Sequence, residues 1–466
     1  MPKPLPVSTP PSAAPARVGI ISLGCPKNTV DTEVLLGRIA QDHVVCADPS
    51  DADVVVVNTC AFLDQAREES LAVIREVEGW KRAGKIKGVV VTGCLAQRWG
   101  DRLREEEPDV DAVLGMAEYG RIGEVMRNVL SPRAAAEIAQ APWRTLVAED
   151  PSFPVEAQTG RLRVTPRHYA YLQVSEGCSN ACTFCSIPTF RGLFRSKTRE
   201  AVLAEAQELV AAGACELNII SQDTTDWGHD LPGAPGLESL LAELSELDGL
   251  AWIRLLYAYP GHVSDPMVEA MASLPKVVPY LDMPIQHIST PVLKRMGRRH
   301  TREETHTLLR TLRARVPELV LRTTFIVGFP GETEAQFQEL IDFTEEFRFE
   351  RLGAFPYSHE PSTPAGERFE DDIPAEVKAE RLDRIMSTQQ PIAFAHAASL
   401  VGKRFEVLVE GEDDEGQVLA RSPYDAPEID PVVYLQDAQG LPAGAMVEVE
   451  VTRADGYDVH AELPQT

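Results

Sequence analysis

Long apolar stretches are missing from this sequence of 466 residues. No apolar run approaches the roughly 20 residues that a helix needs to cross a bilayer. The first sixteen residues are rich in Pro and Ala and lack the apolar centre of a secretory signal. We therefore interpret residues 1–16 as a disordered tail, and we expect a cytoplasmic protein without membrane contact. At roughly 100–200 residues per domain, the length predicts two to four domains.

Basic residues are scarce, because 45 Lys and Arg stand against 71 Asp and Glu and give a net charge of −26. A chain this acidic repels nucleic acid unless its basic residues gather in patches. A basic protein partner is therefore easier to explain than RNA or DNA.

Cysteine is also infrequent, with eight residues in the whole chain. Without a secretory signal, an even count does not argue for disulfides, and reduced cysteines of a cytosolic enzyme are more often metal-binding or catalytic. The eight are Cys25, Cys46, Cys60, Cys94, Cys178, Cys182, Cys185 and Cys215.

The first part of the chain alternates short β-branched runs with amphipathic helical stretches. This alternation predicts an α/β fold with a parallel sheet and crossover helices, of the Rossmann or flavodoxin-like kind, over residues 17–130. A segment rich in Ala and Pro at 131–165 is interpreted as a linker with at most a short ordered piece. The expected strands are 18–23, 54–57, 89–91 and 111–114.

The central part, residues 166–395, shows six strand and helix units, fewer than the eight of a closed barrel, and so predicts a partial (βα)6 barrel. It ends in one long charged helix over 366–395. The expected strands are 169–174, 216–220, 252–257, 280–283, 323–327 and 351–355.

The last part, residues 397–464, has short strand patterns separated by Gly, Pro and Asp, which predict a small antiparallel, OB-like β-barrel. The expected strands are 405–409, 418–420, 432–435 and 446–452. Residues 396–466 contain four Lys or Arg and fifteen Asp or Glu. A barrel that binds RNA phosphates should be basic, so this one should prefer a basic polypeptide, unless its charges merely solvate the surface.

The strongest chemical signal is Cys178-Ser-Asn-Ala-Cys182-Thr-Phe-Cys185, directly after the first central strand. Three thiolates in eight residues suit a soft metal or a cluster. Three ligands would leave one iron of a four-iron cubane open to a small molecule, whereas zinc would require a fourth protein ligand. The alternatives are a chance grouping and a redox pair.

A second triad, Cys25, Cys60 and Cys94, follows three expected strands. Since ligands of open α/β sheets bind at the carboxyl ends of strands, these thiols could converge on one site. The alternative is three buried structural thiols. Cys46 and Cys215 lack such a placement and are interpreted as small buried hydrophobic residues.

The spacing of Cys178, Cys182 and Cys185 after the first strand of a partial barrel resembles the radical S-adenosylmethionine (SAM) superfamily. This resemblance implies a [4Fe-4S] cluster whose open iron binds the amino and carboxylate groups of SAM. It also implies that Phe184 packs near the adenine. The run Gly328-Phe329-Pro330-Gly331-Glu332 resembles the glycine-containing motif on the adenine side; alone, it is as well explained by a tight turn.

The whole chain, from residue 17 to about 464, resembles the methylthiotransferases, which have an N-terminal cluster domain, a radical SAM domain and a C-terminal TRAM barrel. Several segments resemble the ribosomal-protein aspartate methylthiotransferases, the RimO group. They are Ser22-Leu23-Gly24-Cys25-Pro26-Lys27-Asn28, Ser175-Glu176-Gly177-Cys178-Ser179-Asn180 and Asp425-Ala426-Pro427-Glu428-Ile429-Asp430.

The resemblance implies transfer of a methylthio group to the β-carbon of an aspartate in small-subunit ribosomal protein twelve, free or on the ribosome. It implies two [4Fe-4S] clusters, with the second on Cys25, Cys60 and Cys94 carrying the sulfur. SAM would be both radical source and methyl donor. A reducing electron donor such as flavodoxin or ferredoxin would be needed.

Candidate SAM contacts lie at the ends of the central strands. Ser221 and Gln222 end the second strand, and Gln286 follows the fourth; together with Phe184 and Gly328 they should face one mouth. His287 is interpreted as a structural hydrogen-bonding residue. The basic run Arg191, Arg195 and Lys197 is interpreted as a solvated loop, with contact to a carboxylate of SAM or substrate as the alternative.

Two other functions compete with this one. A transfer-RNA methylthiotransferase would use the same chemistry on an adenosine, but the acidic terminal barrel and the run Pro26-Lys27-Asn28 disfavour it. A non-catalytic iron–sulfur adaptor of the ribosome is disfavoured by the intact SAM motif. Cleavage of SAM to 5′-deoxyadenosine distinguishes an enzyme from an adaptor.

Overall fold

The computed structural model of the chain describes residues 15–131, 141–153 and 155–464. The chain divides into two compact units. The first comprises the described residues up to Glu149, except Phe62–Asp64, together with Gly160–Leu162, and the second comprises the rest. Of the expected tail, residues 1–14 lie outside the described residues, while Ala16 is buried and its carbonyl accepts a hydrogen bond from the Val44 amide at 2.9 Å.

The first unit contains a six-stranded parallel sheet in the order β2-β1-β3-β4-β5-β6, which confirms the predicted flavodoxin-like fold. Its central strands are buried along their whole length, as their runs of Val require. The strands are β1 (Arg17–Ser22), β2 (Val44–Val45), β3 (Val54–Thr59), β4 (Gly88–Gly93), β5 (Ala112–Leu114) and β6 (Thr145–Leu146). The last of these comes from the segment expected as a linker.

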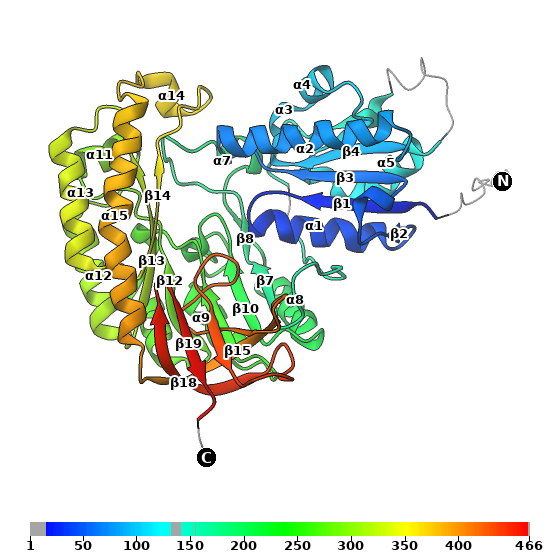
Figure 1. Cartoon of the computed structure of the whole chain (residues 1–466). Helices are drawn as coiled ribbons and strands as arrows, with labels where there is room; N and C mark the ends of the chain where they lie inside the picture. The colour runs from blue at the N-terminus through cyan, green and yellow to red at the C-terminus, as the bar shows by residue number, and fades with distance from the viewer. Residues whose placement is uncertain (1–14, 132–140, 154, 465–466) are drawn as a thin grey trace. The chain divides into compact units, whose positions relative to one another are not determined.

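Helices cover both faces of this sheet, with α1 and α2 on opposite sides (Figure 1). Crossovers between parallel strands are right-handed, so two helices lie on opposite faces when their connections run in opposite directions along the sheet. Here α1 follows β1 toward β2, and α2 follows β3 toward β4 on the other side. The strand order therefore reverses between β1 and β3. The helices are α1 (Pro26–Ile39), α2 (Asp64–Arg82), α3 (Cys94–Trp99), α4 (Asp101–Glu106) and α5 (Ile122–Val129).

The second unit begins with a six-stranded parallel sheet in the order β14-β13-β12-β11-β10-β7, which is the predicted partial barrel. Residues alternate along each strand: Leu217 and Ile219 of β10 belong to the hydrophobic core under the helices, and Glu216 and Asn218 take the opposite face. The strands are β7 (Tyr169–Gln173), β10 (Glu216–Ile220), β11 (Trp252–Leu255), β12 (Val277–Asp282), β13 (Val320–Val327) and β14 (Arg351–Pro356).

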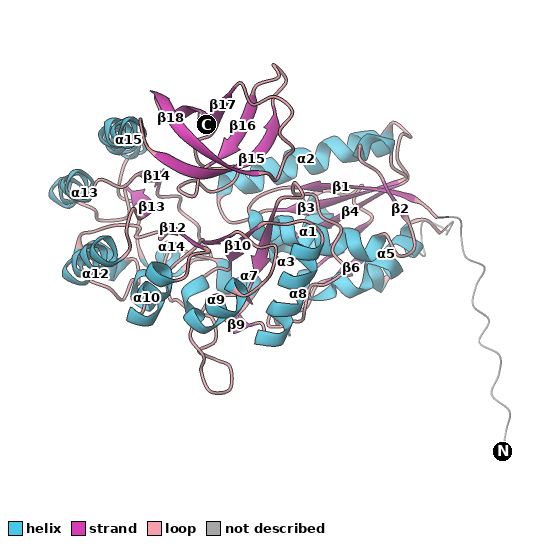
Figure 2. Ribbon diagram, turned by 90° about the horizontal axis from the view of Figure 1, so that it is seen from below, coloured by secondary structure: helices cyan, strands magenta, loops and turns pink. Residues whose placement is uncertain are grey.

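Helices line one face of this sheet in an arc, as Figure 2 shows. Two short strands, β8 (Ser175–Glu176) and β9 (Arg195–Ser196), form a separate ribbon. The helices are α7 (Ile187–Arg191), α8 (Arg199–Ala211), α9 (Leu237–Ser245), α10 (Asp265–Ser273), α11 (Thr290–Arg295), α12 (Arg302–Arg315), α13 (Glu334–Phe347), α14 (Pro364–Arg368) and α15 (Ala375–Ser399). No described helix is both long and apolar enough to cross a membrane.

The expectation of one continuous helix over 366–395 is wrong, because the chain forms α14 and α15 with an extended connection. Pro374 starts α15 and disfavours helical backbone in the residue before it. Phe369 is extended and its ring lies 6.1 Å from that of Phe329, so a tertiary contact draws it out of the helix. The Lys378 ammonium then holds the connection through Asp371 at 2.6 Å.

The chain ends in a closed barrel in the order β15-β16-β17-β19-β18, as predicted for the terminal domain (Figure 2). Four of its five strands were expected. The fifth, β19, closes the barrel by pairing with β18 in the final hairpin and with β17 in parallel, so the barrel is not antiparallel throughout as expected. The strands are β15 (Arg404–Glu412), β16 (Val418–Arg421), β17 (Val433–Gln436), β18 (Met446–Asp455) and β19 (Asp458–Glu462).

Buried ion pairs attach this barrel to the central sheet. Glu216 of β10 accepts from the Arg254 Nε of β11 at 2.8 Å and also from the Arg421 guanidinium of β16. Arg421 Nε donates to Glu410 Oε1 at 2.8 Å. Although burial alone raises the pKa of Glu216, the two guanidinium groups outweigh it and lower that pKa. The junction is therefore held by a network of buried charges, in which Arg421 is a partner of both Glu216 and Glu410.

The loop after β16 continues this junction. Asp425 accepts from Arg351 Nε at 3.2 Å, and Asp430 accepts from the Tyr280 hydroxyl at 2.6 Å. Glu428 accepts from the Tyr169 hydroxyl at 2.8 Å. The acids of the run at 425–430 thus bind three strands of the central sheet, which explains structurally why this run is acidic.

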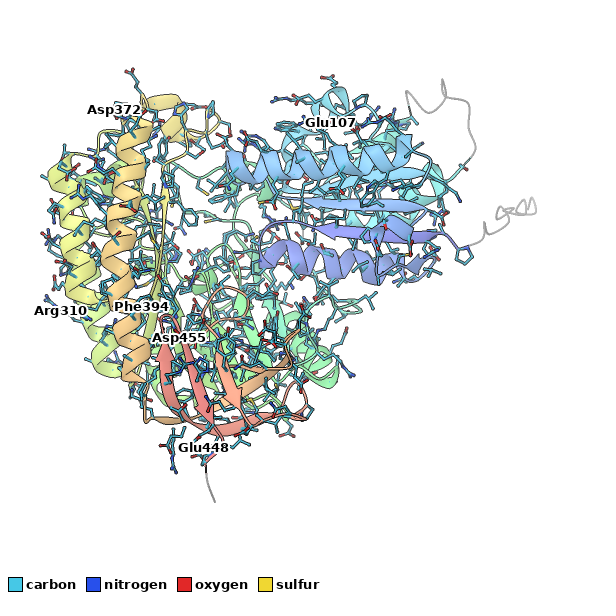
Figure 3. All side chains as sticks on the ribbon, viewed as in Figure 1. Glu107, Arg310, Asp372, Phe394, Glu448 and Asp455 are labelled. Carbon is cyan, nitrogen blue, oxygen red and sulfur yellow. The ribbon has the colours of Figure 1, made fainter. Side chains whose placement is uncertain are left out.

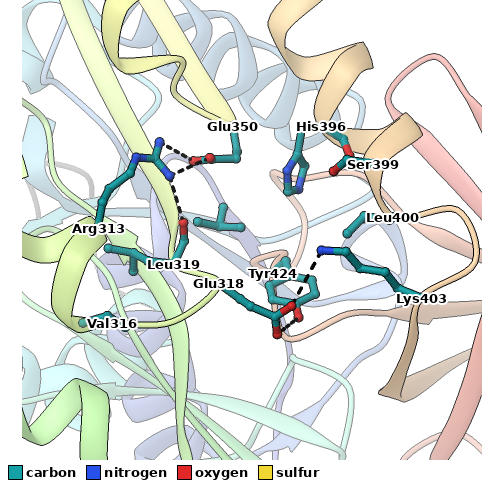
Figure 4. A pocket seen from close by; sticks show the side chains of 11 residues that line it. Arg313, Val316, Glu318, Leu319, Glu350, His396, Ser399, Leu400, Lys403 and Tyr424 are labelled. Atoms are coloured by element: carbon teal, nitrogen blue, oxygen red, sulfur yellow. Dashed lines mark hydrogen bonds and ion pairs between the residues drawn. The ribbon is translucent and has the colours of Figure 1, made fainter. Parts of the chain in front are cut away.

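A polar cavity of about 220 Å³ lies beside the junction (Figure 4). In it, Arg313 pairs with Glu350 at 2.8 Å, and the Tyr424 hydroxyl donates to Glu318 at 2.9 Å. The lining includes Val320, the first residue of β13, so the cavity belongs to the amino ends of the strands. This is the opposite edge of the central sheet from the loop that carries Cys178, Cys182 and Cys185.

Candidate functional site

The first cysteine triad lies at the carboxyl edge of the first unit's sheet. Cys25 precedes α1 and Cys60 follows β3, so these two flank the point at which the strand order reverses. Cys94 opens α3 directly after β4. In flavodoxin-like sheets this crevice is where ligands bind.

Asn28 and Gly24 bring the loops of this triad together. A Cβ on Gly24 would lie only 3.2 Å from the Cys60 Sγ, and Gly24 has φ +97°, which favours glycine. The Cys94 Sγ lies 3.7 Å from the Asn28 Oδ1, and the Asn28 Nδ2 donates to the Thr59 carbonyl at 3.0 Å. The run at 22–28 therefore supports the loops of this triad and also contains one of its cysteines, Cys25.

The second triad is carried by the loop between β8 and α7. The Cys178 amide donates to the Gly192 carbonyl at 3.1 Å, and the Cys185 amide donates to the Cys182 carbonyl at 3.2 Å. A Cβ on Gly177 would lie 2.2 Å from the Leu193 carbonyl oxygen, so only glycine permits this approach. Backbone contacts thus fix the loop before any ligand binds.

Two thiols of this loop, those of Cys178 and Cys185, have a raised pKa. Burial raises the pKa of Cys178 to about 11. Burial, and then the neighbouring Cys182, raise the pKa of Cys185 well above its ordinary value. Since metals bind thiolates and release their protons on binding, these buried thiols fit a metal cofactor better than a free nucleophile.

The donor set fits a cluster better than a single ion. Within the described parts of the chain, the group of three donors whose ligand atoms all lie within 4.8 Å of one another is Asp223, Asp226 and His262, and neither cysteine triad meets that spacing. A cubane separates its thiolates because each binds a different iron. Among the described residues, three cysteines per triad with no fourth cysteine assigned to either match a [4Fe-4S] cluster with one open iron.

The structure places Ser221 and Gln222 beside the second triad's loop. The Ser221 Oγ lies 2.5 Å from the Ser175 Oγ, and the Gln222 Nε2 donates to Glu176 at 2.9 Å. Among the described residues, the Gln222 Oε1 has no hydrogen-bond partner although it is buried, and the same holds for the Oε1 of Gln286. Such acceptors are suited to a ligand that donates hydrogen bonds.

Phe184 and Gly328 have structural roles that the sequence did not reveal. Phe184 packs against a small core that includes Met296, Phe329 and Tyr357. Gly328 has φ +70°, and a Cβ there would lie 2.4 Å from the Lys378 Cγ of α15. The glycine is therefore needed for the approach of a helix, whether or not SAM also contacts it.

The interpretation of the basic run as a solvated loop is wrong. Arg191 is buried and pairs with the buried Glu176 at 3.1 Å, and Lys197 is buried and pairs with Glu205 at 2.7 Å. Although burial alone raises the pKa of Glu176, Arg191 outweighs it and lowers that pKa. Arg195 lies over the ring of Phe153. Arg191 and Lys197 thus meet carboxylates of the protein itself, while Arg195 donates to the backbone carbonyls of Leu193 and Arg191.

Asp223 and His262 also lie beside the loop of the second triad, and no sequence pattern predicted them. The Asp223 Oδ2 accepts from the Asn180 Nδ2 at 2.6 Å and lies 2.8 Å from the His262 Nδ1. The hydrogen bond to Asp223 raises the pKa of His262. Because these residues come from loops after different strands, only the fold brings them together.

Three further expectations concern single residues. His287 is structural, as predicted: it is buried, its Nε2 lies 3.3 Å from Glu332, and its Nδ1 accepts from the Ser289 amide. Cys46 and Cys215 are half-buried rather than buried, and each has a polar neighbour. Neither belongs to a triad.

Three known families match the chain in succession. Uncharacterized protein family UPF0004 matches residues 17–115, the radical SAM superfamily matches 172–344, and the TRAM domain matches 401–463. A protein of Geobacter sulfurreducens named "Ribosomal protein uS12 methylthiotransferase RimO" is 44% identical over 455 residues, covering 97% of this chain and 99% of that protein. The chain belongs to the RimO family.

Further relatives of the same name support this assignment. One from Anaeromyxobacter sp. (strain Fw109-5) is 47% identical and covers 96% of this chain and 93% of its own, and one from Myxococcus xanthus is 44% identical with 97% and 92% covered. The chain is therefore a radical SAM methylthiotransferase, and its cofactors are SAM and two [4Fe-4S] clusters.

Solved structures support the fold alone. The radical SAM methyltransferase TsrM of Kitasatospora setae, with cobalamin and a [4Fe-4S] cluster bound, has a TM-score of 0.55 at 16% identity, covering 76% of this chain and 77% of that one. The cobalamin-dependent SAM radical enzyme OxsB has a TM-score of 0.50 at 17% identity, covering 80% and 56%.

Proposed function

We propose that this RimO family member adds a methylthio group to the β-carbon of an aspartate in ribosomal protein uS12. The observation that carries the proposal is the near full-length similarity to uS12 methylthiotransferases in a chain with two cysteine triads at strand ends. The test is the mass of uS12 from cells with and without the gene, which should differ by one methylthio group. A methylthio group on a transfer-RNA adenosine, with uS12 unchanged, contradicts the proposal.

The two triads hold the two clusters in this proposal. Cys178, Cys182 and Cys185 hold the cluster that cleaves SAM, while Cys25, Cys60 and Cys94 hold the one that supplies sulfur. The clusters contribute electron and sulfur chemistry, and the chain contributes position, charge and exclusion of water. Flavodoxin or ferredoxin is the proposed class of electron donor.

The same mouth provides the proposed SAM contacts. The buried Oε1 atoms of Gln222 and Gln286 are acceptors for the SAM amino group or the ribose hydroxyls. Ser221, Phe184 and Gly328 complete the proposed set. Asp223 lies beside Asn180 of the cysteine loop and adds negative charge suited to the sulfonium of SAM.

Iron content tests the ligand assignment. Protein reconstituted without oxygen should bind about eight irons, since each triad would hold a four-iron cubane. Replacing Cys178, Cys182 and Cys185 by Ala should leave about half, and replacing Cys25, Cys60 and Cys94 should do the same. Iron analysis and absorption spectra measure this. Replacement of Cys46 and Cys215 by Ala is the control and should leave the iron content unchanged. Complete loss of iron from a folded single-triad variant contradicts two independent sites.

The terminal barrel is the proposed contact for uS12, because its free surface is acidic. Of its fifteen carboxylates, four contact the central sheet: Glu410, Asp425, Glu428 and Asp430. None of the other eleven is buried, and three basic residues, Lys403, Arg404 and Arg453, oppose them. Glu448 and Asp455 project outward in Figure 3. A basic ribosomal protein fits this surface, and a phosphate backbone does not.

Charge reversal on the barrel should weaken uS12 binding. Asp413 accepts two backbone hydrogen bonds within its own turn, so it is left in place, and Glu412, Asp414 and Glu415 are replaced by Lys. We expect Kd to rise by on the order of tenfold at low salt, with less difference at high salt because exposed charges are screened. Isothermal titration calorimetry or bio-layer interferometry measures Kd.

The matched control places the same charge change on α15, by Lys at the exposed positions Glu376, Glu380 and Asp383. It should bind uS12 nearly as the parent does. Equal weakening by both triple variants would show that net charge alone matters and that the barrel is not the contact.

A further inference from the structure

The turn between α11 and α12 is docked on the loop of the second triad. The Thr183 amide donates to the Met296 carbonyl at 2.9 Å, and the Thr183 hydroxyl donates to the Arg295 carbonyl at 2.7 Å. Gly297 has φ +71°, and a Cβ there would lie 2.2 Å from the Ala181 carbonyl oxygen. The turn can therefore reach the cysteine loop only with glycine at this position.

This turn places Arg298 against one cysteine. The Arg298 Nη1 lies 3.6 Å from the Cys182 Sγ, within hydrogen-bond distance for sulfur. Its Nη2 donates to the Pro284 carbonyl at 2.6 Å, and its guanidinium lies 4.2 Å from the centre of the Tyr259 ring. Since Tyr259 and Pro284 follow different strands, two further loops fix the orientation of this side chain.

The charge of Arg298 has no carboxylate partner among the described residues, although the side chain is only 8% exposed. Its Nε also lacks a hydrogen-bond partner. The nearby His300 adds no charge, because burial and Arg298 lower the pKa of His300 to about 3. A buried guanidinium without a carboxylate is costly, so an anion at Cys182 is the partner that this geometry provides.

We propose that Arg298 sets the reduction potential of the cluster held by Cys178, Cys182 and Cys185. This inference rests on the central cluster of the proposed function. Reduction adds one electron to the cluster, so a donor N–H and a positive charge at a ligand sulfur stabilise the reduced form more than the oxidised form. Arg298 therefore raises the potential and makes the cluster accessible to a biological reductant. It is a positioning residue and takes no part in bond making.

The test is a redox titration followed by electron paramagnetic resonance. It uses the full-length chain with Cys25, Cys60 and Cys94 replaced by Ser, so that the signal comes from the central cluster. Arg298→Gln should lower the reduction equilibrium constant by on the order of tenfold, a shift of about −59 mV for one electron. Arg298→Lys keeps the positive charge but loses the planar guanidinium that donates to Cys182 and Pro284 together, so it should shift the reduction potential less. Arg299→Gln removes the same charge from the next, exposed residue and should leave the potential unchanged.

SAM binding to the same variants separates this role from another one. The proposal expects Arg298→Gln to bind SAM with a Kd within about twofold of the parent. Loss of SAM binding at an unchanged potential overturns it, because Arg298 would then be a ligand of the SAM carboxylate. An equal potential shift in Arg299→Gln also overturns it. So does loss of the cluster from both Arg298 variants, which would make the residue structural. A parent that binds no cluster refutes the proposed function instead.

Discussion

Cys60→Ala should still cleave SAM to 5′-deoxyadenosine but should leave uS12 unmodified, whereas Cys182→Ala should do neither. Cys60 belongs to the triad between β3 and its neighbours, and Cys182 belongs to the loop after β8. Each loss should be complete to the level without enzyme, because a cluster with two ligands is not held. Chromatography of 5′-deoxyadenosine and mass spectrometry of uS12 measure the two outcomes separately.

Cys46→Ala is the matched control in the first unit, since Cys46 is half-buried and stands outside the triad. It should retain both activities. The division of labour is wrong if Cys60→Ala stops formation of 5′-deoxyadenosine while the central cluster remains intact by spectroscopy.

Arg421→Met should lower the free energy of unfolding of the second unit by about 3–5 kcal/mol, because it leaves buried carboxylates without their partner. Arg421 is only 3% exposed and pairs with Glu216, which is fully buried, and with Glu410. Urea unfolding measures the loss, and amide exchange in β15–β19 shows whether the barrel loosens first.

Arg404→Met is the control, because Arg404 pairs with Glu450 on the exposed side of the same barrel and such pairs contribute at most about 1 kcal/mol. Adding Glu216→Gln to Arg421→Met should recover part of the loss, since the stranded charge is removed. A loss as small as that of the control would mean that the junction does not depend on this network.

The sequence predicted the fold well where periodicity is strong. All six strands of the central sheet were expected, because each is a short segment between helical patterns. Of the strands that were not expected, β2 and β6 have two residues each and carry too little pattern to be seen. The break between α14 and α15 was missed because it depends on the contact of Phe369 with Phe329. A contact between residues 40 positions apart leaves no trace in the local sequence pattern.

The candidate site could be predicted only in part for a related reason. The six cysteines were predicted as cluster ligands from their spacing and their place after strands, which are local signals. Arg298, Asp223 and Glu176 were missed because their roles depend on partners far away in sequence, such as Cys182 at 116 positions from Arg298. The basic run after the cysteines was misinterpreted because Glu176 and Glu205, which neutralise it, cannot be identified without the fold.

The buried junction between the terminal barrel and the central sheet holds the barrel in a fixed position relative to that sheet. Arg421, Asp425 and Asp430 bind it to strands of the central sheet, among them the two that precede the proposed SAM contacts Gln222 and Gln286. If uS12 binds the barrel, as proposed, the bound surface is held at a fixed distance from the loop of Cys178, Cys182 and Cys185. The enzyme would then select its aspartate by distance: the modified residue is the one separated from the bound surface by the right length of uS12 chain.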